Sequence, residues 1–143
     1  MKLIIGGVAQ GKLAIAKQLC ESGYRTESAC STNIALDVNR VLTIVDENFD
    51  SIEELYTANI INHFHLIIRR LLIENIELEH ITEQIVKKNP AVIIVSTEIG
   101  YGIVPMDSFE REYRERTGRI CCKIVEGAEE VYRVVCGIAT KMK

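Results

Sequence analysis

Met-Lys-Leu-Ile-Ile-Gly-Gly-Val-Ala-Gln-Gly-Lys-Leu, residues 1–13, carries the strongest structural signal in this chain. The apolar run Leu3–Ile5 predicts a buried strand, and the glycines that follow it predict a turn. Leu13 and the alanines after it are good helix formers, so a helix is expected to begin near Lys12. A strand that leads through a glycine-rich turn to a lysine at the start of a helix is an arrangement that holds the phosphates of a nucleotide.

The chemistry of a triphosphate explains this pattern. Several backbone amides must converge on the phosphates, and glycine permits the close approach and the unusual dihedral angles that this requires. The N-terminus of the helix adds its dipole, and the Lys12 ammonium neutralises phosphate charge. The alternative is a glycine-rich turn that binds no ligand. We predict that a nucleotide contacts the whole loop, which consists of Gly6, Gly7, Val8, Ala9, Gln10, Gly11, Lys12 and Leu13.

One position of the loop departs from the usual pattern. The spacing fits Gly-x4-Gly-Lys, but the next residue is Leu13, where a Ser or Thr hydroxyl normally contacts magnesium. This change removes a metal contact and leaves the amides and the lysine in place. The sequence therefore supports nucleotide binding better than turnover.

Length and composition restrict the class of protein. A chain of 143 residues with 48% apolar and 26% charged residues predicts a single domain over residues 1–143. The net charge of −3 gives no support for a nucleic-acid partner, and no apolar run approaches the roughly 20 residues of a membrane helix. Because the chain starts directly with a strand, we expect no signal peptide and a cytoplasmic location. The five cysteines lack paired metal-site spacing and are expected to be reduced, mostly buried thiols.

The remaining pattern predicts an α/β fold. The first helix is expected to stop at Gly23, and Asp107 followed by Glu110 predicts the start of another helix. The run Ala91–Val95 is apolar without alternation, which is typical of a parallel strand covered on both faces. Further strands are expected at 24–29, 41–45, 131–136 and 139–143, and further helices at 60–73 and 76–88. With the phosphate loop, this order predicts a P-loop NTPase-like three-layer fold with a mostly parallel sheet.

A second group of motifs lies in the C-terminal half. The segment after the apolar strand contains Glu98, Gly100, Gly102, Ile103, Val104 and Pro105, and the helix after it contains Arg111, Tyr113, Arg114, Glu115, Gly118 and Arg119. Together with the N-terminal loop and the final Val-Tyr-Arg-Val-Val-Cys-Gly-Ile, these motifs resemble the adenosylcobinamide kinase / adenosylcobinamide-phosphate guanylyltransferase family of cobalamin biosynthesis. The resemblance covers residues 1–20 and 91–143, about half of the chain.

The resemblance implies a function. Members of this family phosphorylate a hydroxyl of adenosylcobinamide and then transfer GMP from GTP onto that phosphate. Both steps need Mg²⁺ and take place in the cytoplasm, and the family assembles as homotrimers. The ligands implied for this chain are therefore ATP or GTP, a corrinoid and Mg²⁺, and the implied assembly is a homo-oligomer.

The chain also departs from the family. The family carries a His-x2-Arg-Arg-Pro-x2-Trp-like segment whose histidine accepts GMP, and this chain has neither such a segment nor any Trp. A family strand ends in an Asp that serves the metal, and Asn62 stands in its place here. With Leu13, the usual metal ligands are thus absent at two positions, although Asp46 at a strand end is a candidate for the missing metal ligand.

Acidic and basic residues of the C-terminal half supply further candidates. Glu98 follows a buried strand at its carboxyl end, where open α/β sheets place their ligands. Its carboxylate is expected to hold magnesium through water or to contact a substrate hydroxyl or a nucleobase, and the alternative is a structural cap. Arg111 and Arg114 share one helix face and suit phosphates, and their alternative is salt bridging with neighbouring glutamates.

The histidines are candidates for metal ligands and for nucleophiles. Positions two apart on a helix point about 200° from each other, so His63 and His65 would not share one metal ion. Asn62, His65 and Arg69 would form one helical stripe, which either faces phosphate or is a solvated polar face. His65 is the candidate to replace the missing guanylylated histidine.

Three functions remain open from the sequence. The first is a transferase of cobalamin biosynthesis that uses Lys12, Glu98 and His65 as catalytic residues and binds nucleotide through the loop, Asn62, Arg111 and Arg114. The second is a catalytically degenerate nucleotide- or corrinoid-binding relative that acts as a sensor or partner subunit. The third is a kinase that acts on another alcohol.

Overall fold

The computed structural model describes residues 1–27 and 41–143. Within these residues, six strands form one sheet in the order β2-β3-β4-β1-β5-β6. The strands are β1 (Lys2–Gly6), β2 (Ile44–Val45), β3 (Ile60–Ile61), β4 (Ile93–Val95), β5 (Glu130–Val135) and β6 (Ile138–Lys141). The helices are α1 (Lys12–Glu27), a 3-10 helix η1 (Ile52–Tyr56), α2 (Phe64–Ile73), α3 (Leu78–Lys88) and α4 (Ser108–Gly127).

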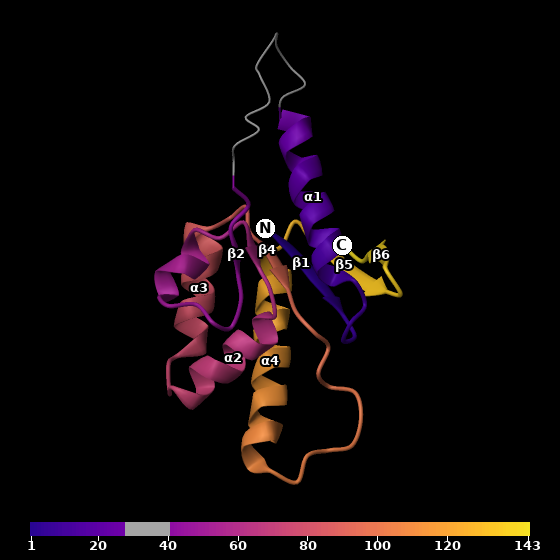
Figure 1. The fold of residues 1–143 in the computed structure, drawn as a ribbon. Coiled ribbons are helices and arrows are strands. Elements are labelled where there is room, and N and C mark those ends of the chain that lie inside the picture. The colour runs from indigo at the N-terminus through magenta and orange to yellow at the C-terminus, as the bar shows by residue number, and fades with distance from the viewer. Residues whose placement is uncertain (28–40) are drawn as a thin grey trace.

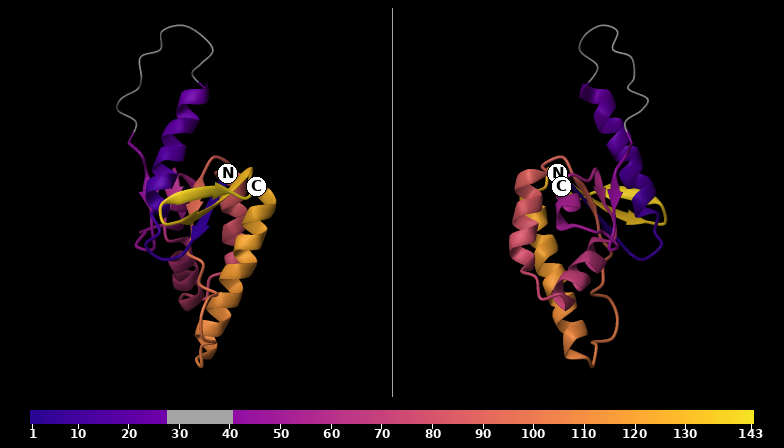
Figure 2. Two further views of the ribbon diagram at one scale, coloured as in Figure 1. Left: turned by 90° about the vertical axis from the view of Figure 1, so that its right-hand side faces the viewer. Right: turned by 60° about the vertical axis from the view of Figure 1, so that its left-hand side comes forward.

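The sheet is the middle of three layers. Helix α1 lies on one face, and α2, α3 and α4 lie on the other (Figures 1 and 2). Neighbouring residues of β1 point to opposite sides, because Leu3 belongs to the core under α2–α4 whereas Ile4 belongs to the core under α1. The strands β1 to β5 pair in parallel and β6 pairs with β5 in antiparallel fashion. The predicted three-layer α/β fold with a mostly parallel sheet is confirmed.

Local signals predicted several elements correctly. Strand β1, the turn and α1 follow one another as expected, and β4 is buried along its whole length. The side chain of Asp107 accepts a hydrogen bond from the Glu110 amide at 3.0 Å, so α4 begins with the predicted cap. Helix α3 ends at Lys88, before Asn89 and Pro90, as predicted.

The boundaries near residues 23 and 60 were predicted wrongly. Helix α1 runs through Gly23 to Glu27, so the first part of the expected strand 24–29 is helical, and its remainder lies outside the described residues. Ile60 and Ile61 form β3 instead of the first turn of a helix, and α2 begins at Phe64. Both isoleucines are fully buried between β2 and β4, where a β-branched residue packs well.

The cysteines are less buried than expected. The four in the described residues are free thiols; Cys20 is buried and Cys121 is half-buried, but Cys122 and Cys136 are exposed. Cys30 lies outside the described residues. Among the described helices, none combines the length and the hydropathy needed to cross a bilayer.

Candidate functional site

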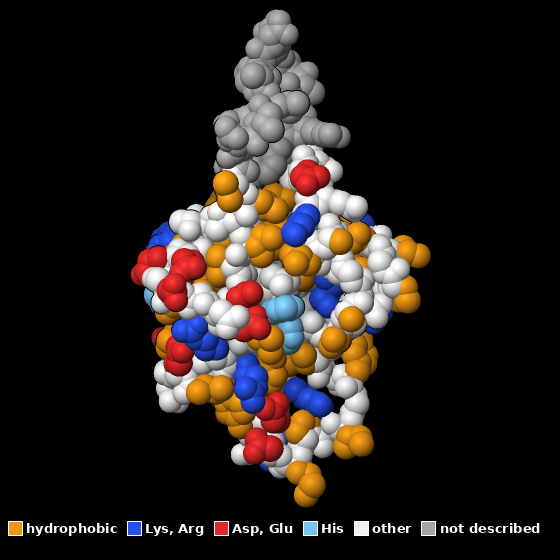
Figure 3. Space-filling view, viewed as in Figure 1, with side chains coloured by type: hydrophobic (Ala, Val, Ile, Leu, Met, Phe, Trp, Pro, Cys, Tyr) orange, Lys and Arg blue, Asp and Glu red, His pale blue; other side chains and the backbone are white. Residues whose placement is uncertain are grey.

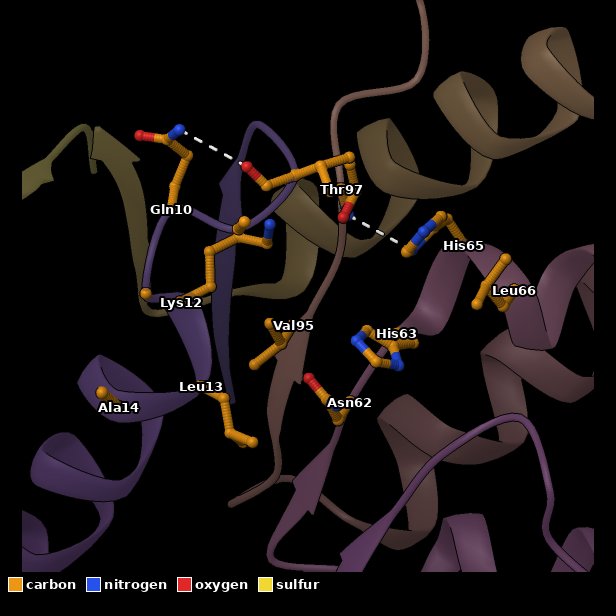
Figure 4. A pocket seen from close by; sticks show the side chains of 13 residues that line it. Gln10, Lys12, Leu13, Ala14, Asn62, His63, His65, Leu66, Val95 and Thr97 are labelled. Carbon is orange, nitrogen blue, oxygen red and sulfur yellow. Dashed lines mark hydrogen bonds between the residues drawn. The ribbon is translucent and has the colours of Figure 1, made fainter. Parts of the chain in front are cut away.

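A pocket of about 420 Å³ opens where the carboxyl ends of β1, β3 and β4 meet the N-terminus of α1 (Figure 4). Its lining comes from two parts of the chain. The phosphate loop and α1 contribute Val8, Ala9, Gln10, Gly11, Lys12, Leu13 and Ala14, and the opposite wall consists of Asn62, His63, His65, Leu66, Val95 and Thr97. This edge of a parallel sheet is where α/β proteins place their ligands.

Hydrogen bonds from the turn between β5 and β6 hold the loop in place. The side-chain oxygen of Gln10 accepts a hydrogen bond from the Cys136 amide at 2.5 Å, and its carbonyl accepts one from the Gly137 amide at 3.1 Å. The turn between β5 and β6 therefore supports the loop from behind. Gly11 has a φ of 82° and Ala9 a φ of 56°, so the loop uses left-handed backbone conformations at two positions.

Lys12 is directed into the loop. Its side chain lies almost entirely inside the protein, at 8% exposure, and its Nζ donates to the Gly7 carbonyl at 2.5 Å. Burial lowers the pKa of Lys12, and the nearby Glu98 carboxylate partly opposes this shift. The Lys12 ammonium thus lies inside the loop, and its contact with a phosphate stays a prediction.

Glu98 lies one residue beyond the pocket lining and is paired with Arg133 of β5. The two side chains approach to 3.1 Å between Arg133 Nε and Glu98 Oε1, and the guanidinium also donates to the Tyr101 hydroxyl at 3.3 Å. The Glu98 amide donates to the Gly6 carbonyl at 3.1 Å. Glu98 therefore anchors the segment after β4 to the phosphate loop. No motif pointed to Arg133, because its pairing with Glu98 depends on β5 lying beside β1.

Asn62 and His65 both lie in the pocket wall, but not on one helical stripe. Asn62 follows β3, and its amide donates to the Val45 carbonyl at 2.7 Å. His65 lies in the first turn of α2, and its Nδ1 accepts a hydrogen bond from the Thr97 amide at 3.4 Å. Arg69 pairs with Glu110 at 3.0 Å and does not line the pocket. The predicted stripe is wrong because the helix starts two residues after Asn62.

Burial keeps His65 neutral. Its side chain is only 9% exposed, and burial, together with the nearby His63 and Lys12, lowers its pKa to about 4. Since Nδ1 accepts a hydrogen bond, the proton of the neutral ring lies on Nε2. A ring nitrogen that carries a proton is not a nucleophile, so this tautomer argues against the predicted nucleophilic role of His65.

His63 is the pocket residue that the sequence interpretation undervalued. It is the N-cap of α2 with a left-handed backbone (φ 50°, ψ 39°), and its side chain is 48% exposed. Its Nδ1 lies 3.2 Å from Glu47 Oε2, and its ring meets that of His65 edge-on at 6.0 Å. In Figure 3, histidine side chains reach the surface near the centre of the displayed face. A histidine directly after a buried strand was the signal that could have identified it.

Arg111 and Arg114 do not line the pocket. Arg111 donates to the carbonyls of Pro105 and Met106 at 2.9 and 2.6 Å, and Arg114 donates to the Ile103 carbonyl at 2.9 Å. Both arginines thus hold the segment between β4 and α4, which leaves the sheet and runs beside α4 (Figure 1). These contacts differ from the alternative of salt bridges within the helix, and phosphate binding by either arginine stays a prediction.

The residues of the pocket fit a magnesium ion poorly. The residue after the lysine is Leu13, which has no hydroxyl and packs, half-buried, against the core under α1. Asn62 offers a neutral amide, and Asp46 accepts a hydrogen bond from the Asn48 amide at 3.0 Å. Within residues 1–27 and 41–143, no group of three or more His, Cys, Asp or Glu side chains is placed to hold a metal ion.

Comparison with known proteins supports the resemblance seen in the sequence. A 52-residue stretch is 40% identical to the bifunctional adenosylcobalamin biosynthesis protein CobU of Salmonella typhimurium, and the same values hold for the protein of that name from Escherichia coli. The matched stretch spans 36% of this chain and only 29% of either relative. The model of the CobU family, described as cobinamide kinase / cobinamide phosphate guanyltransferase, matches residues 46–142. Since this match covers most of the chain, the protein belongs to the CobU family, whose fold is P-loop NTPase-like.

Proposed function

We propose that this protein is a nucleotide-dependent transferase of cobalamin biosynthesis that phosphorylates the hydroxyl of adenosylcobinamide. The observation that carries the proposal is the open phosphate loop with the Lys12 ammonium turned into it. Membership of the CobU family supports the class of reaction. ATP or GTP is the proposed phosphoryl donor.

The residues of the pocket suit phosphoryl transfer, which depends mainly on positioning and charge neutralisation. The loop amides and the N-terminus of α1 would bind the phosphates of the nucleotide, and Lys12 would balance the charge that develops on the transferred group. Glu98 keeps the segment after β4 against the loop through its amide. We infer that the corrinoid hydroxyl approaches from the opposite wall, between Asn62 and Thr97.

Transfer of GMP to the phosphorylated product is the weaker part of the proposal. It was expected to use His65, whose ring is buried and carries its proton on the nitrogen that is not bonded to Thr97. We therefore propose the kinase step as the principal activity. The chain is also proposed to work as a single domain in a cytoplasmic homo-oligomer, which light scattering of the purified protein would test.

A second candidate function is favoured by Leu13 and Asn62. A relative that binds nucleotide or corrinoid without turnover, as a sensor or partner subunit, would tolerate the loss of both usual metal contacts. The two hypotheses differ in one measurable quantity, which is the transfer of label.

The experiment incubates the purified protein and Mg²⁺ with adenosylcobinamide and GTP labelled at either the γ- or the α-phosphate, with γ-labelled ATP in parallel. Movement of the γ-label onto corrinoid supports the kinase, and movement of the α-label reveals GMP transfer. Tight binding of nucleotide without either transfer supports the degenerate relative. Transfer to a different alcohol, with none to adenosylcobinamide, would leave the chemistry intact and change the acceptor.

A further inference from the structure

His63 combines exposure with a fixed orientation. It follows β3 at the carboxyl edge of the sheet, and its carbonyl accepts the first hydrogen bonds of α2, from Leu66 at 2.7 Å and Ile67 at 3.3 Å. The backbone is thereby fixed on both sides, while the ring remains accessible and lines the phosphate-loop pocket. Figure 4 shows the ring between Asn62 and His65, on the wall that faces Lys12.

Glu47 sets the tautomer of this ring. An ionised carboxylate only accepts hydrogen bonds, so the 3.2 Å contact with Glu47 Oε2 places the proton of neutral His63 on Nδ1. Glu47 is itself held, because Arg70 donates to its carbonyl at 3.0 Å and to that of Phe49 at 2.7 Å. The lone pair of His63 Nε2 is consequently free to accept a proton in the pocket. His65 has the opposite tautomer.

The carboxylate nearest to the His63 ring favours uptake of a proton by the ring. Glu47 faces His63 from the segment after β2 and stabilises the ring when it is protonated. Lys12 lines the same pocket from α1 and His65 from α2, and of these two groups the Lys12 ammonium opposes a positive charge on the ring, which the Glu47 carboxylate offsets. A proton taken up by the ring can pass to solvent, because half of the side chain is exposed.

We propose that His63, oriented by Glu47, is the general base that takes the proton of the acceptor hydroxyl. This inference rests on the proposed phosphoryl transfer. As the hydroxyl oxygen forms its bond to the γ-phosphorus, the bond from that phosphorus to the β-phosphate oxygen breaks and the nucleoside diphosphate leaves. The hydroxyl proton moves to His63 Nε2, and the ring later releases it to water. His63 is then a catalytic residue, and Glu47 is a positioning residue.

The test uses His63→Gly, because glycine adopts the left-handed backbone of this position and leaves space for a small molecule. We expect kcat for phosphoryl transfer to fall about a hundredfold or more, with little change in the KM for nucleotide. Added imidazole should restore part of kcat in this variant and none in wild type. His63→Asn, which also tolerates the backbone, should lose the same activity and resist rescue because its amide fills the space.

Two further variants test the positioning role of Glu47 and provide a control. Glu47→Gln keeps the shape of the side chain and should lower kcat less than the loss of His63 does. His80→Ala, at an exposed position of α3 outside the pocket, is the matched histidine control and should behave as wild type.

Several outcomes would overturn the proposal. If His63→Gly retains kcat within a few-fold, His63 is not the general base. The same conclusion follows if kcat is lost without imidazole rescue although nucleotide still binds. A phosphorylated or nucleotidylated His63 trapped by intact-mass spectrometry would make it a nucleophile instead. Wild-type protein that transfers no label to any alcohol would refute the proposed function and this inference together, so the two failures are distinguishable.

Discussion

Gly6, at the end of β1, leaves no space for a Cβ atom. Its φ is 152°, and a Cβ added there would lie 2.3 Å from the carbonyl oxygen of Val134 in β5. Because that oxygen belongs to a neighbouring strand, the overlap is relieved only if β1 and β5 separate. We expect Gly6→Ala to lower the free energy of unfolding by about 3 kcal/mol or more, as measured by urea denaturation.

Gly7 offers the matched control for this substitution. Its added Cβ would meet the flexible side chain of Gln10 at 3.4 Å, and no backbone atom lies closer. Gly7→Ala should therefore cost less than about 1 kcal/mol. Equal losses in the two variants would show that contact with β5 does not explain the glycine at position 6.

Leu13 is the residue at which binding and turnover are expected to separate. We expect Leu13→Ser to raise the magnesium-dependent transfer rate, because the new hydroxyl stands where a metal contact is normally made. The same change removes a half-buried side chain from the core under α1 and should cost about 1–2 kcal/mol of stability. Transfer rates and urea midpoints of both proteins would check this. A robust wild-type rate that the serine leaves unchanged would contradict the view of Leu13 as a defect.

At the scale of elements, prediction from sequence succeeded where the signal was local. The run Ile93–Val95, the cap at Asp107 and the turn after β1 each lie within a few consecutive residues. The boundary between β3 and α2 could not be found in this way. Ile60 fits both the helical stripe of the following residues and a buried strand, and only its pairing with β2 and β4 decides between them.

The same reasoning applies to the candidate site. The loop and the position of Lys12 were predictable because they lie between β1 and α1, which follow each other directly in the sequence. The partners Arg133 of Glu98 and Glu47 of His63 were not, because each pair joins side chains that lie 35 or 16 residues apart. Pairs of this kind are created by the order of strands in the sheet.

The Glu130 carboxylate joins three strands, and its pKa predicts how the stability of the fold changes in acid. From β5 its carboxylate contacts Lys2 of β1 and Lys141 of β6, both at 2.7 Å. The hydrogen bonds from Lys141 and Lys2 lower the pKa of Glu130 to about 2 from its ordinary value of 4.5. The unfolded chain thus binds the proton first, and the stabilisation present above pH 4.5 is lost as the pH falls through about 2.

The substitution Glu130→Gln should remove this contribution. At neutral pH we expect a loss of about 1 kcal/mol, a modest value because the lysines are partly exposed to solvent. The difference between wild type and variant should shrink as the pH falls from 4.5 towards 2, which urea midpoints at a series of pH values would show. A difference that stays constant across that range would mean that the carboxylate is not linked to folding.

At the scale of the whole molecule, two separate parts of the chain line one pocket. The family match begins at residue 46 and therefore does not include the phosphate loop. The loop supplies Lys12, whereas the matched region supplies Asn62, His63 and Thr97 from the opposite wall. A ligand that spans both walls would connect the N-terminal strand and helix with the rest of the sheet.

Such a ligand should stabilise the entire fold. A nucleotide that binds only the folded state adds about 2.7 kcal/mol to stability at one hundred times its dissociation constant, which corresponds to a rise of roughly 5–10 °C in Tm. We expect ATP or GTP to produce this rise in wild type and in Lys17→Ala, whose lysine is exposed on α1. Lys12→Ala should abolish it, because the loop then lacks the ammonium that we propose faces the phosphates. Thermal unfolding with increasing nucleotide measures the effect, and an equal rise in Lys12→Ala would place the nucleotide away from the loop.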